Sequence, residues 1–262
     1  MSLVADEFSA LAERLWRAGS ERRPCEPLTD DFPALTVAEA YRISKLNLER
    51  RLKERRERLV GRKIGLTSAA VQKQLGVDQP DFGYLTSGMQ VSDGSSLASG
   101  ALLQGKVEGE VVFSLKQPLR GPGVGIAEVL AATDWVAPCI EIIDSRVRDW
   151  KIKIQDTIAD NASSAYFVLG ARRTSPTGVD LKASKMTLAI DGEVRSTGQG
   201  TACLGDPALA VAWLANALGA LGDGLSAGDI VLSGAYGPVV RFEPGSRCEV
   251  EIEGLGKVAC SC

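Results

Sequence analysis

Two glutamates stand two residues apart in the segment KVEGEVVFSL, Lys106–Leu115, where most of the other residues are apolar. Because side chains at i and i+2 of a strand point to the same face, Glu108 and Glu110 would project together. Paired carboxylates can bind a metal ion or carry out acid–base chemistry, but a strand with one face in water has the same pattern. The motif alone leaves both interpretations open.

A second segment has the same alternation and serves as a comparison. In CEVEIEG, near the C-terminus, Glu249, Glu251 and Glu253 alternate with apolar residues. A hairpin turn follows directly, so we expect these three side chains to face solvent. An isolated Glu-x-Glu motif is therefore weak support for a functional site.

A third carboxylate strengthens the functional interpretation. Glu141 lies in VAPCIEIIDSRV, whose β-branched residues predict a buried strand. An unpaired buried carboxylate is costly, and a divalent cation would offset its charge. Together Glu108, Glu110 and Glu141 would form an oxygen site that suits Mg²⁺ or Mn²⁺ better than zinc or copper.

The chain contains no histidine. This excludes Ser-His-Asp and Cys-His catalysis and zinc sites built on imidazole. Acid–base chemistry must then use carboxylates, lysine, tyrosine, cysteine or metal-bound water. Lys63, in GRKIGLTS, lies among small and apolar residues before a short helix expected from Thr67 or Ser68 to Gly76. A lone lysine is more often simply solvated, so the residues alone do not make Lys63 catalytic.

The segment KIQDTIADNASS is dense in polar groups, and we expect it to have mixed β character. Its polar members include Asp156, Asp160, Asn161 and Ser163. They could line a binding site, or they could form a turn held by side-chain-to-backbone hydrogen bonds. The pattern favours neither interpretation.

Composition restricts the possible partners. The 30 Lys and Arg residues against 33 Asp and Glu residues give a net charge of -3 without a dense basic patch, so we do not expect nucleic acid binding. No apolar run approaches the ~20 residues of a membrane span, and the N-terminus reads as an acidic amphipathic helix rather than a signal peptide. Six cysteines without framework spacing predict reduced thiols. We therefore expect a cytoplasmic protein.

These residues must be positioned by two kinds of structure. Helices are expected near the N-terminus, where Thr36 and Glu39 form a capping box, and later in GIAEVLAATDW and DPALAVAWLANALGALG. Hairpins are expected at Asp191-Gly192 and at residues 254–256. Between residues 60 and 95 the sequence changes from helical patterns to short β-rich segments with frequent glycine. We predict an α+β protein with a helical N-terminal region, residues 1–75, and a mainly antiparallel mixed domain, residues 76–262.

Several long motifs, in order along most of the chain, resemble those of one enzyme family. They are GRKIGLTS, QLGVDQPDFGYL, KVEGEVVFSL, PCIEIIDSRVRDWKIKIQDTIADNAS and LSGAYGPVV. These motifs resemble the 2-hydroxypenta-2,4-dienoate (2-keto-4-pentenoate) hydratases of the fumarylacetoacetate hydrolase-like superfamily. The resemblance implies a β-roll catalytic domain, Mg²⁺ or Mn²⁺ as cofactor, a homo-oligomer and a role in meta-cleavage catabolism of aromatic compounds.

The resemblance also implies roles for individual residues. By motif, these are the metal ligands Glu108, Glu110 and Glu141, the catalytic residues Lys63, Asp81 and Asp156, and the substrate-binding residues Leu66 and Ser163. A partly desolvated lysine near a metal would have a lowered pKa. Lys63, together with Asp81 or Asp156, would then relay protons or orient water.

The implied reaction is tautomerisation of 2-hydroxypenta-2,4-dienoate followed by addition of water at C4, which gives 4-hydroxy-2-oxopentanoate. Within the family, 2-oxo-3-enedioate (4-oxalocrotonate) decarboxylation and 2-oxoheptenedioate hydration stay open as alternatives. The family also implies association with a decarboxylase of the same pathway. A catalytically silent partner subunit of such a decarboxylase is the alternative that is not an enzyme, and retention of the three glutamates argues against it.

Overall fold

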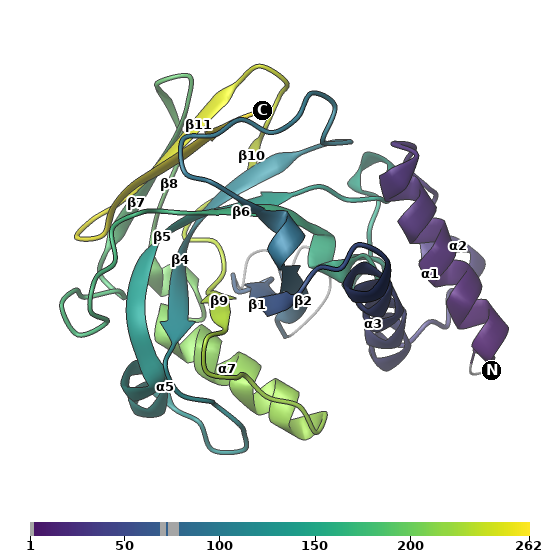
Figure 1. The fold of residues 1–262 in the computed structure, drawn as a ribbon, viewed down its shortest axis with the longest axis horizontal. Helices are drawn as coiled ribbons and strands as arrows, with labels where there is room; N and C mark the ends of the chain where they lie inside the picture. The colour runs from purple at the N-terminus through teal and green to yellow at the C-terminus, as the bar shows by residue number, and fades with distance from the viewer. Residues whose placement is uncertain (1–2, 69–71, 73–78) are drawn as a thin grey trace.

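The structure is a computed structural model that describes residues 3–68, 72 and 79–262. Two β-sheets pack against each other, helices α1 to α3 lie together at one end, and helices α5 and α7 lie beside the strands (Figure 1). The helices are α1 (Ala5–Ser20), α2 (Leu28–Asp31), α3 (Val37–Glu54), α5 (Ile126–Ala132), α6 (Ile154–Ala159) and α7 (Pro207–Ala220). Single 3₁₀ turns are formed by Ser87–Met89, Arg148–Trp150, Asn161–Ser163 and Gly200–Ala202.

The larger sheet has eight strands in the described part of the chain. Its order is β2-β1-β9-β4-β5-β6-β3, and β10 also pairs with β4. Only β1 with β9 and β3 with β6 are parallel among these described pairs. The strands are β1 (Leu59–Gly65), β2 (Asp81–Thr86), β3 (Gln90–Val91), β4 (Lys106–Leu115), β5 (Thr133–Ile143), β6 (Ser164–Leu169), β9 (Ile230–Leu232) and β10 (Val240–Arg241).

The second sheet is antiparallel and has the order β12-β11-β7-β8. It packs on one face of β4: a Cβ added to Gly109 would lie 3.0 Å from side-chain atoms of both Met186 and Val250. Residues alternate between the faces of a strand, so Glu108 and Glu110 point away from this second sheet. Its strands are β7 (Lys185–Ile190), β8 (Glu193–Gln199), β11 (Arg247–Ile252) and β12 (Gly256–Ser261).

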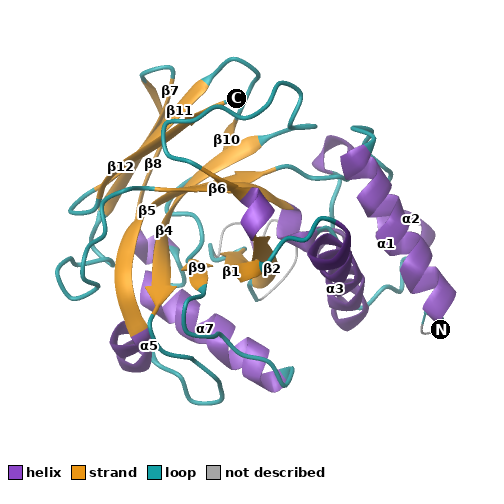
Figure 2. Cartoon of the chain, in the orientation of Figure 1, coloured by secondary structure: helices purple, strands orange, loops and turns teal. Residues whose placement is uncertain are grey.

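The N-terminal helices have a small core of their own, in which Phe8, Leu15 and Ile43 are buried together with Ile158 of α6. The Tyr41 ring of α3 stacks on the Phe82 ring of β2 with a centroid distance of 4.2 Å. Helix α3 therefore lies directly on the larger sheet (Figure 2).

Most of the expected local structure is present. Thr36 and Glu39 cap α3 reciprocally, the Asp206 carboxylate accepts the Ala208 N–H at the start of α7, and the two expected hairpins join β7 to β8 and β11 to β12. Two expectations were wrong. Helix α5 ends at Ala132, because residues 133–135 already pair with β4, and the polar stretch forms helix α6 instead of mixed β structure. The short helix expected from Thr67 or Ser68 to Gly76 lies largely outside the described residues.

The α+β class and the mainly antiparallel larger sheet agree with the prediction. Strand β1, which precedes residue 75, is hydrogen-bonded inside the larger sheet between β2 and β9. The boundary at residue 75 stays a prediction. Helices α1 to α3, which end at Glu54, all precede β1, the first strand of the larger sheet.

One segment of the described residues, Gly200–Ala220, is long and apolar enough to cross a membrane by length and composition. It contains α7, and half of its most apolar window is buried inside the protein. Ala210, Val211 and Leu214 are part of the main hydrophobic core. This is the behaviour of a core helix.

Candidate metal centre

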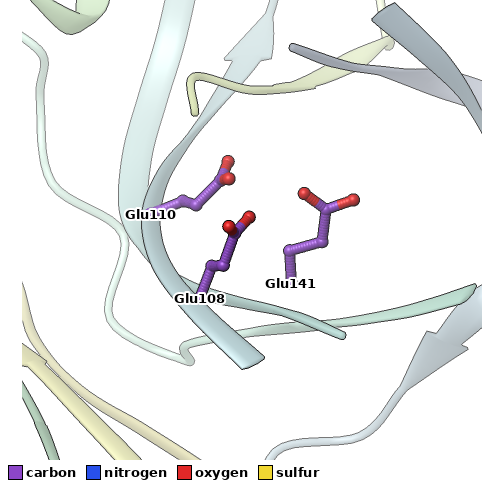
Figure 3. Close-up of side chains that lie close together, drawn as sticks. All are labelled: Glu108, Glu110 and Glu141. Atoms are coloured by element: carbon purple, nitrogen blue, oxygen red, sulfur yellow. The ribbon is translucent and has the colours of Figure 1, made fainter. Parts of the chain in front are cut away.

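Three glutamates converge at one point on the larger sheet. Glu108 and Glu110 belong to β4, Glu141 belongs to β5, and the two strands pair so that Glu108 stands directly opposite Glu141. One carboxylate oxygen from each side chain lies within 4.8 Å of the other two (Figure 3). Like charges directly opposite each other on a sheet are destabilising, so this arrangement needs a compensating positive charge.

Burial makes that need stronger. Glu110 and Glu141 have no exposed surface, and Glu108 is partly buried. The backbone N–H of Gly234 donates to Glu110 Oε2 at 2.9 Å. Among the described residues, Glu110 Oε1 and both oxygens of Glu141 accept no hydrogen bond. Buried carboxylate oxygens without hydrogen-bond partners are rare because each costs free energy, so these oxygens are available to a ligand.

The ionisation of the cluster supports the same conclusion. Burial and the neighbouring Glu141 raise the pKa of Glu108 to about 7. The same two causes raise the pKa of Glu110 well above its ordinary value. Near neutral pH the cluster would therefore retain protons unless another positive charge entered. Three oxygen ligands of this kind fit a hard divalent cation and are poor ligands for soft metals.

Lys63 supplies one positive charge to the cluster from β1. Its Nζ lies 3.3 Å from Glu141 Oε2, and the residue is 3% exposed. Strand β1 is three steps from β5 in the sheet, about 14 Å at the usual strand spacing. The two side chains meet because the sheet curls and both side chains reach into its concave face.

The charge state of Lys63 differs from the expectation. Burial lowers the pKa of Lys63, but Glu141, Asp81, Glu108 and Glu110 together raise it above its ordinary value. The lowered pKa expected for a partly desolvated lysine is therefore not found, because four carboxylates outweigh the loss of water. Lys63 is a protonated ammonium group at neutral pH.

Asp81 lies beside Lys63 at the start of β2. A Cβ added to Gly65 would come within 2.2 Å of Asp81 Oδ1 and 3.2 Å of Lys63 Nζ, so both charged groups lie over this glycine. Burial raises the pKa of Asp81 to about 6, although Lys63 opposes the shift. Its Oδ1 accepts no hydrogen bond within the described part of the chain. Asp81 can therefore exchange a proton near neutral pH.

The structure places Asp156 in a different setting. Its two oxygens accept hydrogen bonds from the Thr29 N–H at 3.0 Å, the Thr29 hydroxyl at 2.8 Å and the Lys153 N–H at 2.9 Å. These bonds cap α6 and hold α2 against it. Asp156 is not a member of the carboxylate cluster, and its hydrogen bonds give it a structural role.

The expected substrate-binding residues lie in strained backbone near the ends of secondary structure. Leu66 follows β1 with φ 56°, and its carbonyl accepts from Gln72 Nε2 at 2.7 Å. Ser163 has φ 55°, and its hydroxyl lies 3.3 Å from the Thr157 hydroxyl. Positive φ is uncommon for side-chain-bearing residues and is concentrated at functional sites. Their contact with a substrate stays a prediction.

The sequence-based prediction of the site did not include two glycines that shape it. Gly65 leaves the space that Asp81 and Lys63 occupy, and Gly234, with φ 99°, directs its N–H to Glu110. A Cβ on Gly234 would lie 2.5 Å from Thr67 Oγ1. The motifs GRKIGLTS and LSGAYGPVV contain both glycines, but nothing in the local pattern identifies what each glycine would approach.

Residues 66–261 match the model of the family described as Fumarylacetoacetate (FAA) hydrolase C-terminal. Relatives include the 2-hydroxyhexa-2,4-dienoate hydratase of Comamonas testosteroni, 50% identical over 93% of each chain. They also include the 2-keto-4-pentenoate hydratase of Burkholderia vietnamiensis, 47% identical over 97% of this chain and 96% of that protein.

Solved structures are similar to this chain as well. The 4-oxalocrotonate decarboxylase from Pseudomonas putida G7, complexed with magnesium and adipate, has a TM-score of 0.95 and 37% identity, covering 99% of this chain and 98% of that one. The fumarylpyruvate hydrolase from Pseudomonas aeruginosa has a TM-score of 0.62 at 18% identity, covering 77% and 88% of the two chains, and so shares the fold.

Proposed function

The chain belongs to the fumarylacetoacetate hydrolase family, and we propose that it is a hydro-lyase that hydrates 2-hydroxypenta-2,4-dienoate to 4-hydroxy-2-oxopentanoate. The observation that carries the proposal is the buried cluster of Glu108, Glu110 and Glu141 beside Lys63. Identity near 50% to named hydratases, against 37% to the decarboxylase, favours hydration over loss of carbon dioxide.

We assign the three glutamates as the ligands of a divalent cation, Mg²⁺ or Mn²⁺. When bound, such an ion supplies a Lewis acid that stabilises negative charge developing on the C2 oxygen of a 2-oxo acid. The carboxylate oxygens that lack hydrogen-bond partners support this assignment. The 4-oxalocrotonate decarboxylase structures contain magnesium or calcium, which agrees with a hard divalent ion.

Lys63 and Asp81 are the groups beside the cluster that can hold or move a proton. Tautomerisation transfers the proton of the C2 hydroxyl to C5, and hydration then adds hydroxyl to C4 and a proton to C3. Asp81, with a pKa of about 6, suits the acceptance and return of these protons. Lys63 remains protonated, so its role is to stabilise negative charge and to orient Glu141.

The remaining features of the proposal rest on relatives. The substrate is a small 2-hydroxydienoate, and the Comamonas testosteroni relative indicates that an additional carbon at the end of the chain is a close alternative. We keep the homo-oligomer, the cytoplasmic location, the role in aromatic catabolism and the association with a pathway decarboxylase as predictions from the family resemblance.

The test uses the purified protein alone with Mg²⁺. Loss of the ultraviolet absorbance of 2-hydroxypenta-2,4-dienoate, with formation of 4-hydroxy-2-oxopentanoate, is the expected result. A parallel reaction with 2-oxohex-3-enedioate should release no carbon dioxide. Carbon dioxide release without hydration would establish the decarboxylase alternative, which the 37% identical neighbour represents. Absence of both reactions with metal present would refute the enzymatic proposal.

A further inference from the structure

A cavity of about 150 Å³ lies away from the carboxylate cluster, where α1 and α3 meet β2 and β6. Tyr84 and Thr86 of β2 line it. Asp81 is an odd number of residues from both, so it points to the opposite face of the strand. The cavity and the metal centre are therefore on opposite sides of β2, and the cavity is a separate site.

Two buried hydroxyl groups in the wall of this cavity have no partner. Ser44 of α3 and Ser164 of β6 are each 2% exposed, and both line the cavity. Within the described residues, neither Oγ makes a hydrogen bond. A buried hydroxyl without a hydrogen bond costs free energy, because it has lost its water without gaining a partner. Two such groups in the wall of one cavity indicate a polar ligand inside it.

The charge around the cavity is mainly positive. Four arginines line it, on three separate segments: Arg22, Arg51, Arg55 and Arg146. Burial lowers the pKa of Arg51 although its partner Glu57 opposes the shift, and Arg55 and Arg146 lower it further. Clustered guanidinium groups favour an anion.

The acidic groups in the wall are already occupied. Asp144 accepts the backbone N–H groups of Leu103 and Gln104, and Asp160 is paired with Arg146. Arg51 is held by Glu57 through Nε at 3.0 Å, and its Nη1 makes no hydrogen bond to the described residues. The Arg55 guanidinium lies 4.5 Å from the centre of the Trp16 ring. The acidic side chains of the wall are thus occupied, whereas Arg51 Nη1 and the Arg55 guanidinium make no hydrogen bond to the described residues.

We propose that this cavity binds a small oxyanion, a carboxylate or a phosphate, between Ser44 and Ser164 with Arg51 and Arg55 as the counter-charges. The volume admits a small anion with its bound water and excludes a nucleotide. Because Ser44 belongs to the N-terminal helices and Ser164 to β6, the anion would join these helices to the sheet. Strand β6 pairs with β5, which carries Glu141.

The test is a calorimetric titration of inorganic phosphate, and separately of succinate, into protein treated with EDTA. Removal of metal prevents succinate from binding through a cation at Glu108, Glu110 and Glu141. Binding of either probe is the expected result. Binding of only one probe would identify the kind of oxyanion. No heat from either probe at about 10 mM, which means no Kd below that concentration, would overturn the proposal.

Variants then locate the binding. The double substitution Ser44→Ala with Ser164→Ala should weaken the affinity about tenfold or more, because two charge-assisted hydrogen bonds are lost. Neither hydroxyl bonds to the described protein, so the fold should not depend on them. Thr174→Val is the matched control, because Thr174 also has a buried hydroxyl without a partner but does not line the cavity. Unchanged affinity in the double variant would contradict the site.

A charge variant provides a second measurement if the double variant is poorly folded. Arg55→Gln should weaken binding and reduce its dependence on salt concentration. Lys45→Gln, on the exposed face of α3, the helix that ends directly before Arg55, should do neither. Equal effects of the two substitutions would mean that the positive charges act only as a general surface potential, and would refute a defined anion site.

Discussion

Strands β4 and β11 contain the same alternation of glutamate with apolar residues, but the central glutamates of the two strands have opposite environments. Glu110 of β4 is completely buried, whereas Glu251 of β11 is exposed, and Glu253 just after β11 is exposed too. Both strands lie inside their sheets with a neighbour on each side. The difference is which face the glutamates occupy: the concave side of a curled sheet in β4 and the outer side of the second sheet in β11.

Each of the two glutamate clusters also has a lysine beside it. Lys257 Nζ lies 2.8 Å from Glu249 and 3.4 Å from Glu251, in an exposed cluster. Lys63 Nζ lies 3.3 Å from Glu141 in a buried one. An exposed ion pair contributes little because water screens it, but a buried charge that loses its partner is strongly destabilising. The two lysines therefore make a matched pair for experiment.

The largest effect is expected from Lys63→Met, which keeps the side-chain length and removes the charge. Activity should fall by about 10²–10⁴, the usual contribution of a positioned proton-transfer or charge-stabilising group. Lys257→Met should leave kcat and KM unchanged, since its partners face solvent. Steady-state assays of both variants check this. A similar loss in both would show that the two lysine clusters are not functionally different.

The next effect is expected from Glu108→Gln, which removes one negative charge from the cluster with little change in shape. Activity should fall by about 10²–10³, and Mg²⁺ affinity measured by calorimetry should fall with it. The matched change Glu251→Gln should alter neither quantity. Retained Mg²⁺ affinity in Glu108→Gln would exclude Glu108 as a ligand.

Gly65→Ala should have an intermediate effect, because its Cβ would come within 2.2 Å of Asp81 Oδ1. We expect a loss of about 1–3 kcal/mol in the free energy of unfolding, typical of overpacking, or a displaced Asp81 with reduced kcat. Gly105→Ala is a useful control, because its nearest contact, at 2.4 Å, is the end of the flexible Leu102 side chain. Chemical denaturation together with kinetics compares the two. Wild-type values for both quantities in Gly65→Ala would contradict the close approach.

A final effect is expected in the pH dependence of stability. The pKa of Glu108 rises from 4.5 to about 7 on folding. A group with a raised pKa in the folded state stabilises the fold below its unfolded pKa and loses that contribution as the pH rises through the folded pKa. The metal-free protein should therefore lose stability between about pH 4.5 and pH 7 from this group.

Mg²⁺ should act in the opposite direction, because it binds the ionised carboxylates in competition with protons. The rise in melting temperature caused by Mg²⁺ should be larger at pH 8 than at pH 5.5. Thermal denaturation with and without Mg²⁺ measures it, and Glu251→Gln should show the wild-type pattern. An equal rise at both pH values would contradict titration of the cluster in this range.

Local sequence patterns predicted the secondary structure well where the signals were local. The capping box of Thr36 and Glu39, the Asp206 cap and the two hairpin turns depend on residues within a few positions of each other, and all are present. The polar stretch around Asp156 was misjudged: its local cap, the Lys153 N–H on the Asp156 carboxylate, was not recognised, and its other partner, Thr29, is far away in the sequence.

The sequence by itself determined the chemistry that this protein can use. Without histidine, and with a carboxylate at position 141 inside an apolar strand, it pointed to an oxygen-ligand metal site that includes Glu108 and Glu110. Only the tertiary structure decided which Glu-x-Glu motif is buried, because alternation fixes a common face but not what covers it. The meeting of Lys63 with Glu141, from strands three steps apart, likewise follows from the curl of the sheet, a property of the whole fold.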